Sequence, residues 1–305
     1  MRFGSVIAWA AVVPLLVAAT QPIRLQPSSR WVLDYAENSC RMSRIFGRGK
    51  DTVIFLLESD APGQMDMLVI GRPFDGHSDQ VPARFLPAQQ KTMQGLTAEA
   101  TSTGDPSILW TNVSWLPDDV RAEVEKESAA HKAKAGVRPP PRDLVEEAMR
   151  NSQRQDFAAR INALEIDVHH DRPVILETGS LGEAIKMFDK CSRDSLRDWG
   201  VDPDLEDKIV RPAWPSNVRV WFSPTDYPAD MLKRGEQSVV KVRLLVDAAG
   251  RITKCTSLSH FKAPEFNQIV CANIIRRARF EPAELTDGTK VPSYYATQVQ
   301  WKIGF

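Results

Sequence analysis

Cysteine has the most specific chemistry of the residues in this chain, and it occurs four times, at Cys40, Cys191, Cys255 and Cys271. No two of them lie within a Cys-x-x-Cys turn, so their spacing does not fit a zinc site. An even number of cysteines in an oxidising compartment indicates two disulfide bonds, although four cysteines allow three pairings. The alternative is a pair of free thiols with a redox role. We predict disulfide bonds.

The histidines do not form a recognisable catalytic or metal site. His169-His170-Asp171 contains two adjacent histidines, whose side chains point to opposite sides of a strand or turn and therefore do not readily share one metal ion. The spacing of a zinc-protease helix or of an iron facial triad is not found. His260 has no nucleophile at a recognisable interval, and the chain has no nucleophile elbow, Walker loop or dinucleotide fingerprint. We therefore predict no enzyme, no metal and no cofactor.

The composition is that of a globular protein without a general affinity for polyanions. The 39 basic and 39 acidic residues cancel, so no net field attracts nucleic acid or an acidic membrane surface. Hydrophobic residues make up 43% of the chain, which is enough to form real cores. A length of 305 residues allows two domains. We therefore expect no nucleic-acid partner.

The N-terminus has the pattern of a signal peptide. Arg2 supplies a positive charge, and Val6 to Val17 is an apolar run interrupted by Pro14. Ala18-Ala19-Thr20 offers the small residues that a signal peptidase requires. The run is a little shorter than the roughly 20 apolar residues of a membrane anchor. We predict cleavage of residues 1–19 after Ala19, with an uncleaved inner-membrane anchor as the alternative.

Residues 20–205 are predicted to form a β-rich domain with packed helices. Short β-prone runs are separated by turn residues, which favours antiparallel pairing. The runs are Trp31–Tyr35, Cys40–Phe46, Thr52–Glu58, Met65–Gly71, Val81–Leu86, Ile108–Trp115, Ile161–Val168 and Pro173–Thr178. Charge-dense segments at about 117–158 predict two exposed helices, separated by an extended break at Gly136–Pro141. A mobile loop is the alternative for this insertion.

The helix that follows these strands suggests one disulfide pair. Ser180 and Glu183 have the spacing of a capping box, and Gly200 is suited to end the helix. Apolar residues at helical spacing between these ends place Cys191 on the buried face. A helix lying on the sheet would bring Cys191 to Cys40, which shares a strand face with Met42. We therefore predict the pair Cys40–Cys191.

After a proline-punctuated linker at 206–215, residues 216–305 have the pattern of a small α+β domain. Val240 to Val246 alternates as a strand with one buried face, and Asp247–Gly250 predicts a tight turn. Ile252–Leu258 is the return strand, Pro264–Arg279 is an amphipathic helix, and a final alternating strand follows. The order is strand, strand, helix, strand in an antiparallel sheet. Because the second strand carries Cys255 and the helix carries Cys271, we predict the pair Cys255–Cys271.

This order of elements resembles the C-terminal domain of the TonB family of energy transducers. The matching landmarks are Tyr227-Pro228-Ala229, Arg234-Gly235, Val242 to Gly250 and Phe280-Glu-Pro-Ala283. The resemblance is limited to the last third of the chain. The chain also departs from the family pattern: Ser5 has no histidine four residues on, and Arg138-Pro-Pro-Pro141 is far shorter than the family's proline-rich spacer. Ser238 and Phe261-Lys-Ala also differ from the usual residues.

The resemblance implies a periplasmic protein of a Gram-negative bacterium that binds a protein partner by β-strand addition. In that family, an extended segment of a TonB-dependent outer-membrane receptor pairs with an edge strand, which links the protein to transport. A three-stranded sheet also leaves an edge unpaired on general grounds. The strand carried over runs from Tyr295 to Ile303. Its residues are Tyr295, Thr297, Gln298, Val299, Gln300, Trp301 and Ile303.

Three other interpretations of the chain remain open. In the first, the edge strand is only a protected edge, with Lys302 as the charge that prevents pairing. In the second, the chain is a true membrane-anchored transducer, and its location is the inner membrane. In the third, the N-terminal domain is an envelope hydrolase, which would require a concave polar pocket with perturbed titrating groups.

Overall fold

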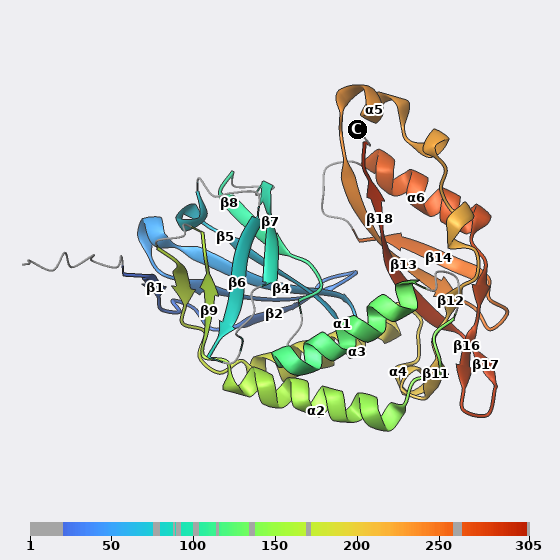
Figure 1. The fold of residues 1–305 in the computed structure, drawn as a ribbon, viewed down its shortest axis with the longest axis horizontal. Coiled ribbons are helices and arrows are strands. Elements are labelled where there is room, and N and C mark those ends of the chain that lie inside the picture. The colour runs from blue at the N-terminus through green and yellow to red at the C-terminus, as the bar shows by residue number, and fades with distance from the viewer. Residues whose placement is uncertain are drawn as a thin grey trace, which may run out of the picture.

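The alternating pattern of the first part of the chain folds into a ten-stranded sheet (Figure 1). The computed structural model describes residues 21–75, 80–87, 89, 93–99, 104–113, 116–133, 138–168, 172–258 and 264–303. The predicted signal peptide, His169-His170-Asp171 and His260 lie outside these residues. We call residues 21–206 the first unit and residues 207–303 the second unit.

The strands of the first unit follow the predicted runs, with two additions. They are β1 (Ile23–Leu25), β2 (Val32–Tyr35), β3 (Cys40–Phe46), β4 (Val53–Ala61), β5 (Gln64–Ile70), β6 (Gln80–Leu86), β7 (Met93–Glu99), β8 (Pro106–Trp110), β9 (Ala163–Ile166) and β10 (Val174–Leu176). Their order is β1-β10-β9-β6-β7-β8-β5-β4-β3-β2, and neighbours are antiparallel except for β1 and β10. β1 and β7 were not expected. Short 3-10 helices lie at Gly49–Asp51 and Arg72–Phe74.

The ten-stranded sheet closes on itself through the segment between β1 and β2. The amide of Ser28 donates to the carbonyl of Ile45 at 2.8 Å, and the amide of Gly47 donates to the carbonyl of Gln26 at 2.9 Å. An isolated bridge also joins Pro27 to Phe46. The segment thus pairs with β3, while β1 pairs with β10. Closure gives the sheet an interior, which large buried side chains fill, among them Phe46, Phe55, Phe85 and Trp110.

Helices α1 (Asp118–Ala133), α2 (Leu144–Arg160) and α3 (Gly182–Asp198) lie together beside the sheet (Figure 1). The side chain of Asp143 accepts hydrogen bonds from the first amides of α2 and so caps it. The expected capping box of α3 is wrong, because Leu181 is the N-cap and the Ser180 hydroxyl donates to the carbonyl of Ala159 instead. Gly200 ends this helix with a φ of +86°, as expected.

The second unit contains the expected strand, strand, helix, strand order with short additions. Its elements are β11 (Ile209–Arg211), β12 (Trp214–Pro215), α5 (Ala229–Arg234), β13 (Ser238–Val246), β14 (Ile252–Ser257), α6 (Pro264–Arg277), β15 (Phe280–Glu281), β16 (Ala283–Leu285), β17 (Lys290–Val291) and β18 (Ser293–Trp301), with 3-10 helices at Val218–Val220 and Pro224–Asp226. The short helix α4 (Pro203–Glu206) ends the first unit. Residues 206–215, expected as a linker, contain β11 and β12, which pair with β16 and β15. The fold class is α+β, as predicted.

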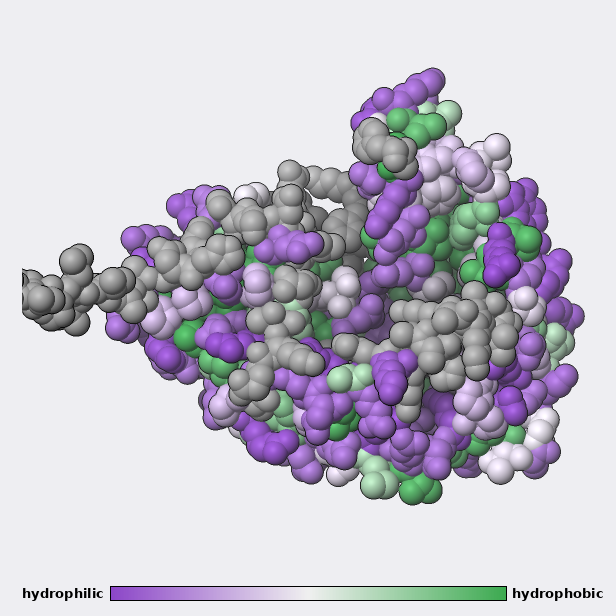
Figure 2. Space-filling model, viewed as in Figure 1, coloured by the Kyte–Doolittle hydropathy of each residue, from purple (hydrophilic) through white to green (hydrophobic). Residues whose placement is uncertain are grey.

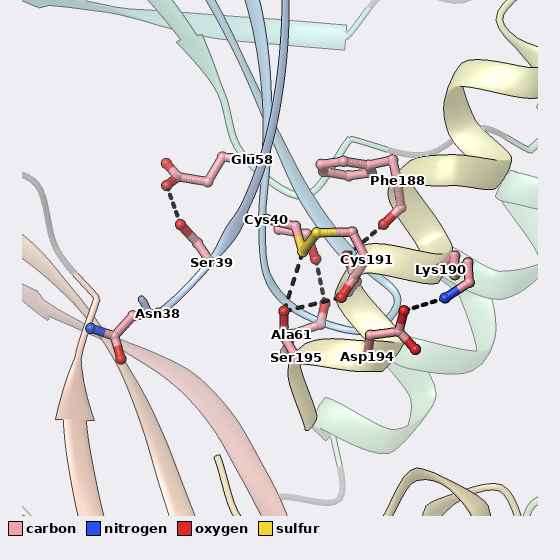
Figure 3. The surroundings of a disulfide bond; sticks show 12 residues. Asn38, Ser39, Cys40, Glu58, Ala61, Phe188, Lys190, Cys191, Asp194 and Ser195 are labelled. Carbon is pink, nitrogen blue, oxygen red and sulfur yellow. Dashed lines mark hydrogen bonds and ion pairs between the residues drawn. A yellow bond between two sulfur atoms is a disulfide. The ribbon is translucent and has the colours of Figure 1, made fainter. Parts of the chain in front are cut away.

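Each unit has its own hydrophobic core and its own disulfide bond. In the second unit, α6 packs against the sheet and Cys255 of β14 bonds to Cys271 of α6. In the first unit, Cys40 of β3 bonds to Cys191 of α3, and both residues are fully buried (Figure 3). The Ser195 hydroxyl lies 3.3 Å from the sulfur of Cys40. Both pairs match the sequence-based expectation, and the described residues include no free cysteine.

Within the described part of the chain, none of the helices combines the length and apolar composition needed to cross a membrane.

Candidate partner-binding edge

The last strand, β18, lies at one edge of the three-stranded sheet. The order of the sheet is β14-β13-β18, and β18 pairs with β13 along its whole length, from Ser293 opposite Val246 to Trp301 opposite Ser238. Among the described residues, no strand pairs with its other side. The structure therefore places the predicted binding residues on an edge strand, except Ile303, which lies just beyond it.

The side chains of β18 alternate between two faces, as the sequence pattern predicts. Val299 and Trp301 point toward α6, and Trp301 makes ring contacts with Phe266 and Tyr227, each with centroids 5.3 Å apart. Tyr295 and Thr297 share this inner face through the strand period. The outer face carries Tyr294, Ala296, Gln298 and Gln300, of which the two glutamines are exposed. Figure 2 shows hydrophilic side chains where β18 runs.

One hydrogen bond in the neighbouring strands settles which main-chain groups of β18 face the free edge. The carbonyl of Lys241 in β13 accepts from the amide of Leu258 at 2.9 Å, so Lys241 directs its main-chain groups toward β14. Directions alternate along a strand, so Val242 directs its groups toward β18, where it lies opposite Thr297. Thr297 therefore pairs with β13. Alternate residues on either side direct their groups to the free edge, namely Tyr294, Ala296, Gln298 and Gln300.

The outer face of this sheet is covered by the first unit, chiefly through Arg243. Its side chain is 2% exposed, and its guanidinium donates to the carbonyls of Asn38 at 3.0 Å and Asp60 at 2.8 Å. The same group stacks on Trp199, 3.3 Å from the ring centre. Burial lowers the pKa of Arg243 to about 10, so the side chain remains charged at neutral pH. In β13 its neighbour Lys241 forms ion pairs with Asp66 and Asp60.

Further contacts between the units cover the beginning of β18. The ring of Tyr294 meets that of Trp199 edge-on, with centroids 6.3 Å apart. The hydroxyl of Ser293 donates to the carboxylate of Glu206 at 2.7 Å. Burial raises the pKa of both Tyr294 and Glu206. The first unit thus holds the N-terminal end of β18, whereas Gln298 and Gln300 stay exposed.

A second zone of contact joins the helical insertion to the second unit. Arg138, whose side chain is 10% exposed, forms ion pairs with Glu281 and Glu284, each at 3.2 Å. It also donates to the carbonyls of Pro212 and Pro282 at 3.0 and 2.7 Å. Arg138, which belongs to the predicted extended break, therefore binds across the small strands of the second unit.

A cleft of about 180 Å³ opens beside β18, between the two units. Its lining from the first unit is polar and consists of Asp60, Gln64 and Asn112. Its lining from the second unit consists of Lys241, Val242, Leu258, Ala296, Thr297 and Gln298. The sequence patterns did not reveal the lining residues of the first unit or the buried position of Arg243. The sequence contained one indication of this contact between the units. Lys241 and Arg243 are two basic residues on the face of the strand that the alternation pattern assigns to solvent.

The described residues contain no cluster of three or more histidine, cysteine or acidic side chains able to hold a metal ion. The edge strand and its polar surroundings are suited to binding a polypeptide main chain.

Comparison with known proteins identifies the second unit. Residues 223–303 match the model of the family described as the Gram-negative bacterial TonB protein C-terminal. No curated protein matches the chain. The family is a protein-interaction domain of the cell envelope without enzymatic activity. The matched residues include α5, β13, β14, α6 and β18, so the last third of the chain is similar to the TonB C-terminal family.

Proposed function

We propose that the protein works in the periplasm and binds an extended segment of an envelope or outer-membrane receptor as an additional strand beside β18. The supporting observation is the free side of β18, where Gln298 and Gln300 present main-chain amides and carbonyls without a strand partner among the described residues. A strand that pairs there gains main-chain hydrogen bonds irrespective of its sequence. On this proposal the protein serves TonB-dependent transport as a binding component, and the whole chain is not an enzyme.

The surroundings of β18 favour strand addition over recognition by a broad side-chain surface. α6 packs on the inner face of the sheet, and the first unit covers much of the outer face. Among the described residues, no strand pairs with the edge from Ala296 toward Ile303, and within this stretch only Lys302 carries a charge. A single charge at the end of a strand weakly opposes pairing along its length.

We expect Gln300→Pro to reduce partner binding at least tenfold, whereas Gln300→Ala leaves it nearly unchanged. Proline removes the amide donor and adds a ring on the free side, and edge strands tolerate proline there. A probe is obtained by selecting displayed peptides of about nine residues, a usual strand length, on the full chain. Dissociation constants of one such peptide for both variants give the result.

Two controls make the experiment specific for the edge. Thr297→Pro removes an amide that pairs with β13, so it should unfold the strand, which circular dichroism and thermal melting would detect. Gln300→Pro should melt within a few degrees of the unmodified protein. Equal losses for alanine and proline would indicate side-chain recognition. Unchanged binding by folded Gln300→Pro would rule out this edge as the site.

We further propose that residues 1–19 are removed as a signal peptide, because the apolar run ends in small residues. Mass spectrometry of the exported protein should then find Thr20 at the N-terminus. Detection of Met1 or Arg2 in the exported protein would contradict cleavage and favour the anchored transducer.

A further inference from the structure

We infer that the first unit supplies a second wall of the partner site and selects a partner strand with a neutral polar side chain opposite Gln298. This inference depends on strand addition at β18. The match to the TonB C-terminal family lies within the second unit. The second wall, which the first unit supplies, therefore belongs to a part of the chain outside that match. The selecting residues are Gln64 and Asn112.

The geometry of the cleft places a partner side chain opposite Gln298 between the two units. A strand added beside β18 places the residue opposite Gln298 with its side chain on the same face as Gln298. That face is the outer one, and there Gln64 and Asn112 line the cleft across from Gln298. The cleft, at about 180 Å³, has room for a single side chain. The partner residue opposite Gln298 therefore meets both units at once.

The side-chain amides that line the cleft are suited to a polar partner residue. Gln64, Asn112 and Gln298 are exposed, and none of their side-chain amides has a hydrogen-bond partner among the described residues. An amide both donates and accepts, so it pairs with the hydroxyl or amide of a serine, threonine, asparagine or glutamine. An apolar side chain would remove water from these groups without replacing its hydrogen bonds. Apolar residues are therefore disfavoured at this position.

The two charged residues of the cleft lining, Asp60 and Lys241, also favour a neutral partner residue. Lys241 stands with Asp60 and Asp66, so both signs are present within one group. A basic or an acidic side chain would meet an equal charge as well as an opposite one. Neither sign gains a clear advantage, whereas a neutral polar group keeps its hydrogen bonds.

The wall is fixed to the sheet, which a selective site requires. The amide of Asn112 donates to the carboxylate of Asp66 at 3.0 Å, and Asp66 pairs with Lys241 of β13. Asn112 holds a φ of +53°, which asparagine tolerates better than most residues. Arg243 of β13 also donates to the carbonyl of Asp60, a residue of the cleft lining. These contacts keep the spacing between the wall and β18.

The test uses the peptide selected on the full chain, with glutamine or leucine placed at each alternate position in turn. We expect one position at which the unmodified protein prefers glutamine by roughly tenfold. In the double variant Gln64→Met and Asn112→Gly, this preference should fall to about twofold. Methionine keeps the length of the glutamine side chain, and glycine accepts the positive φ of Asn112. Gln26→Met, an exposed glutamine remote from the cleft, is the matched control and should keep the full preference.

The outcomes separate this inference from the proposed function. If Gln300→Pro abolishes peptide binding and the double variant keeps the full glutamine preference, the second wall is wrong while strand addition stands. If leucine is preferred at every position, the wall is likewise wrong. If Gln300→Pro leaves binding unchanged, strand addition fails and the inference fails with it.

Discussion

Replacing Cys40 and Cys191 together by alanine is expected to lower the free energy of unfolding of the first unit by about 5 kcal/mol. The two residues are separated by 151 positions, and the loss follows from the loop entropy that the bond removes from the unfolded chain. Both residues are fully buried between β3 and α3, so the substitution also removes packing at the helix. Equilibrium urea unfolding of the oxidised protein and of the double variant measures the difference.

The second disulfide bond provides a matched comparison. Cys255 and Cys271 are separated by 16 positions, so their joint replacement by alanine should cost about 3 kcal/mol on the same reasoning. The order of the two losses is the decisive observation. A larger loss for the shorter loop would show that loop entropy does not dominate, and packing around α6 would then account for the effect.

Arg243→Ala is expected to lower the free energy of unfolding by about 3 kcal/mol, a loss that appears at the boundary between the units. The substitution removes the arginine donor from the buried carbonyl of Asp60 and from the partly buried carbonyl of Asn38, and it removes the cation from the face of Trp199. The loss is moderated because the variant no longer buries a charge. Arg243→Met keeps much of the stacking volume and should lose about half as much.

Hydrogen exchange locates this effect. In Arg243→Ala, amides at 38–42 and 196–201 should exchange faster, since these segments supply the contacts of the guanidinium. Arg251→Ala is the control, because its side chain is 79% exposed in the same hairpin, and it should change stability by less than about 0.5 kcal/mol. Unchanged exchange in Arg243→Ala would show that the units are held together by the Arg138 contacts instead.

Local patterns were sufficient to predict the strand, strand, helix, strand order within the second unit. The alternation from Val240 to Val246, the turn that ends at Gly250 and the helical spacing of α6 each depend on residues close in the sequence. The pair Cys40–Cys191 followed from the buried helix face that carries Cys191. The pair Cys255–Cys271 followed because the second strand of the unit and its helix must pack together. The same reasoning identified β3 with its full bounds, Cys40–Phe46.

Contacts between distant segments were not predictable from these patterns. β1 spans only Ile23–Leu25 and is held by pairing with β10, and the bridge that closes the sheet joins Pro27 to Phe46. Arg243 occupies a position that strand alternation assigns to solvent, and only the first unit makes it buried. Residues 206–215 resemble a linker because of their prolines, yet β11 and β12 pair with strands more than 60 positions later in the chain.

The closed sheet of the first unit has a consequence for the order in which the chain matures. When the polypeptide emerges N-terminus first, β1 has no partner until β10 has also emerged. In the same way, Cys40 cannot form its disulfide bond until Cys191, 151 positions later, has emerged. During that interval one thiol and an unpaired strand are exposed to oxidants and to other chains. Cys255 and Cys271 emerge almost together and are protected from this hazard. Slow synthesis or scarce disulfide isomerase should therefore harm the first unit before the second.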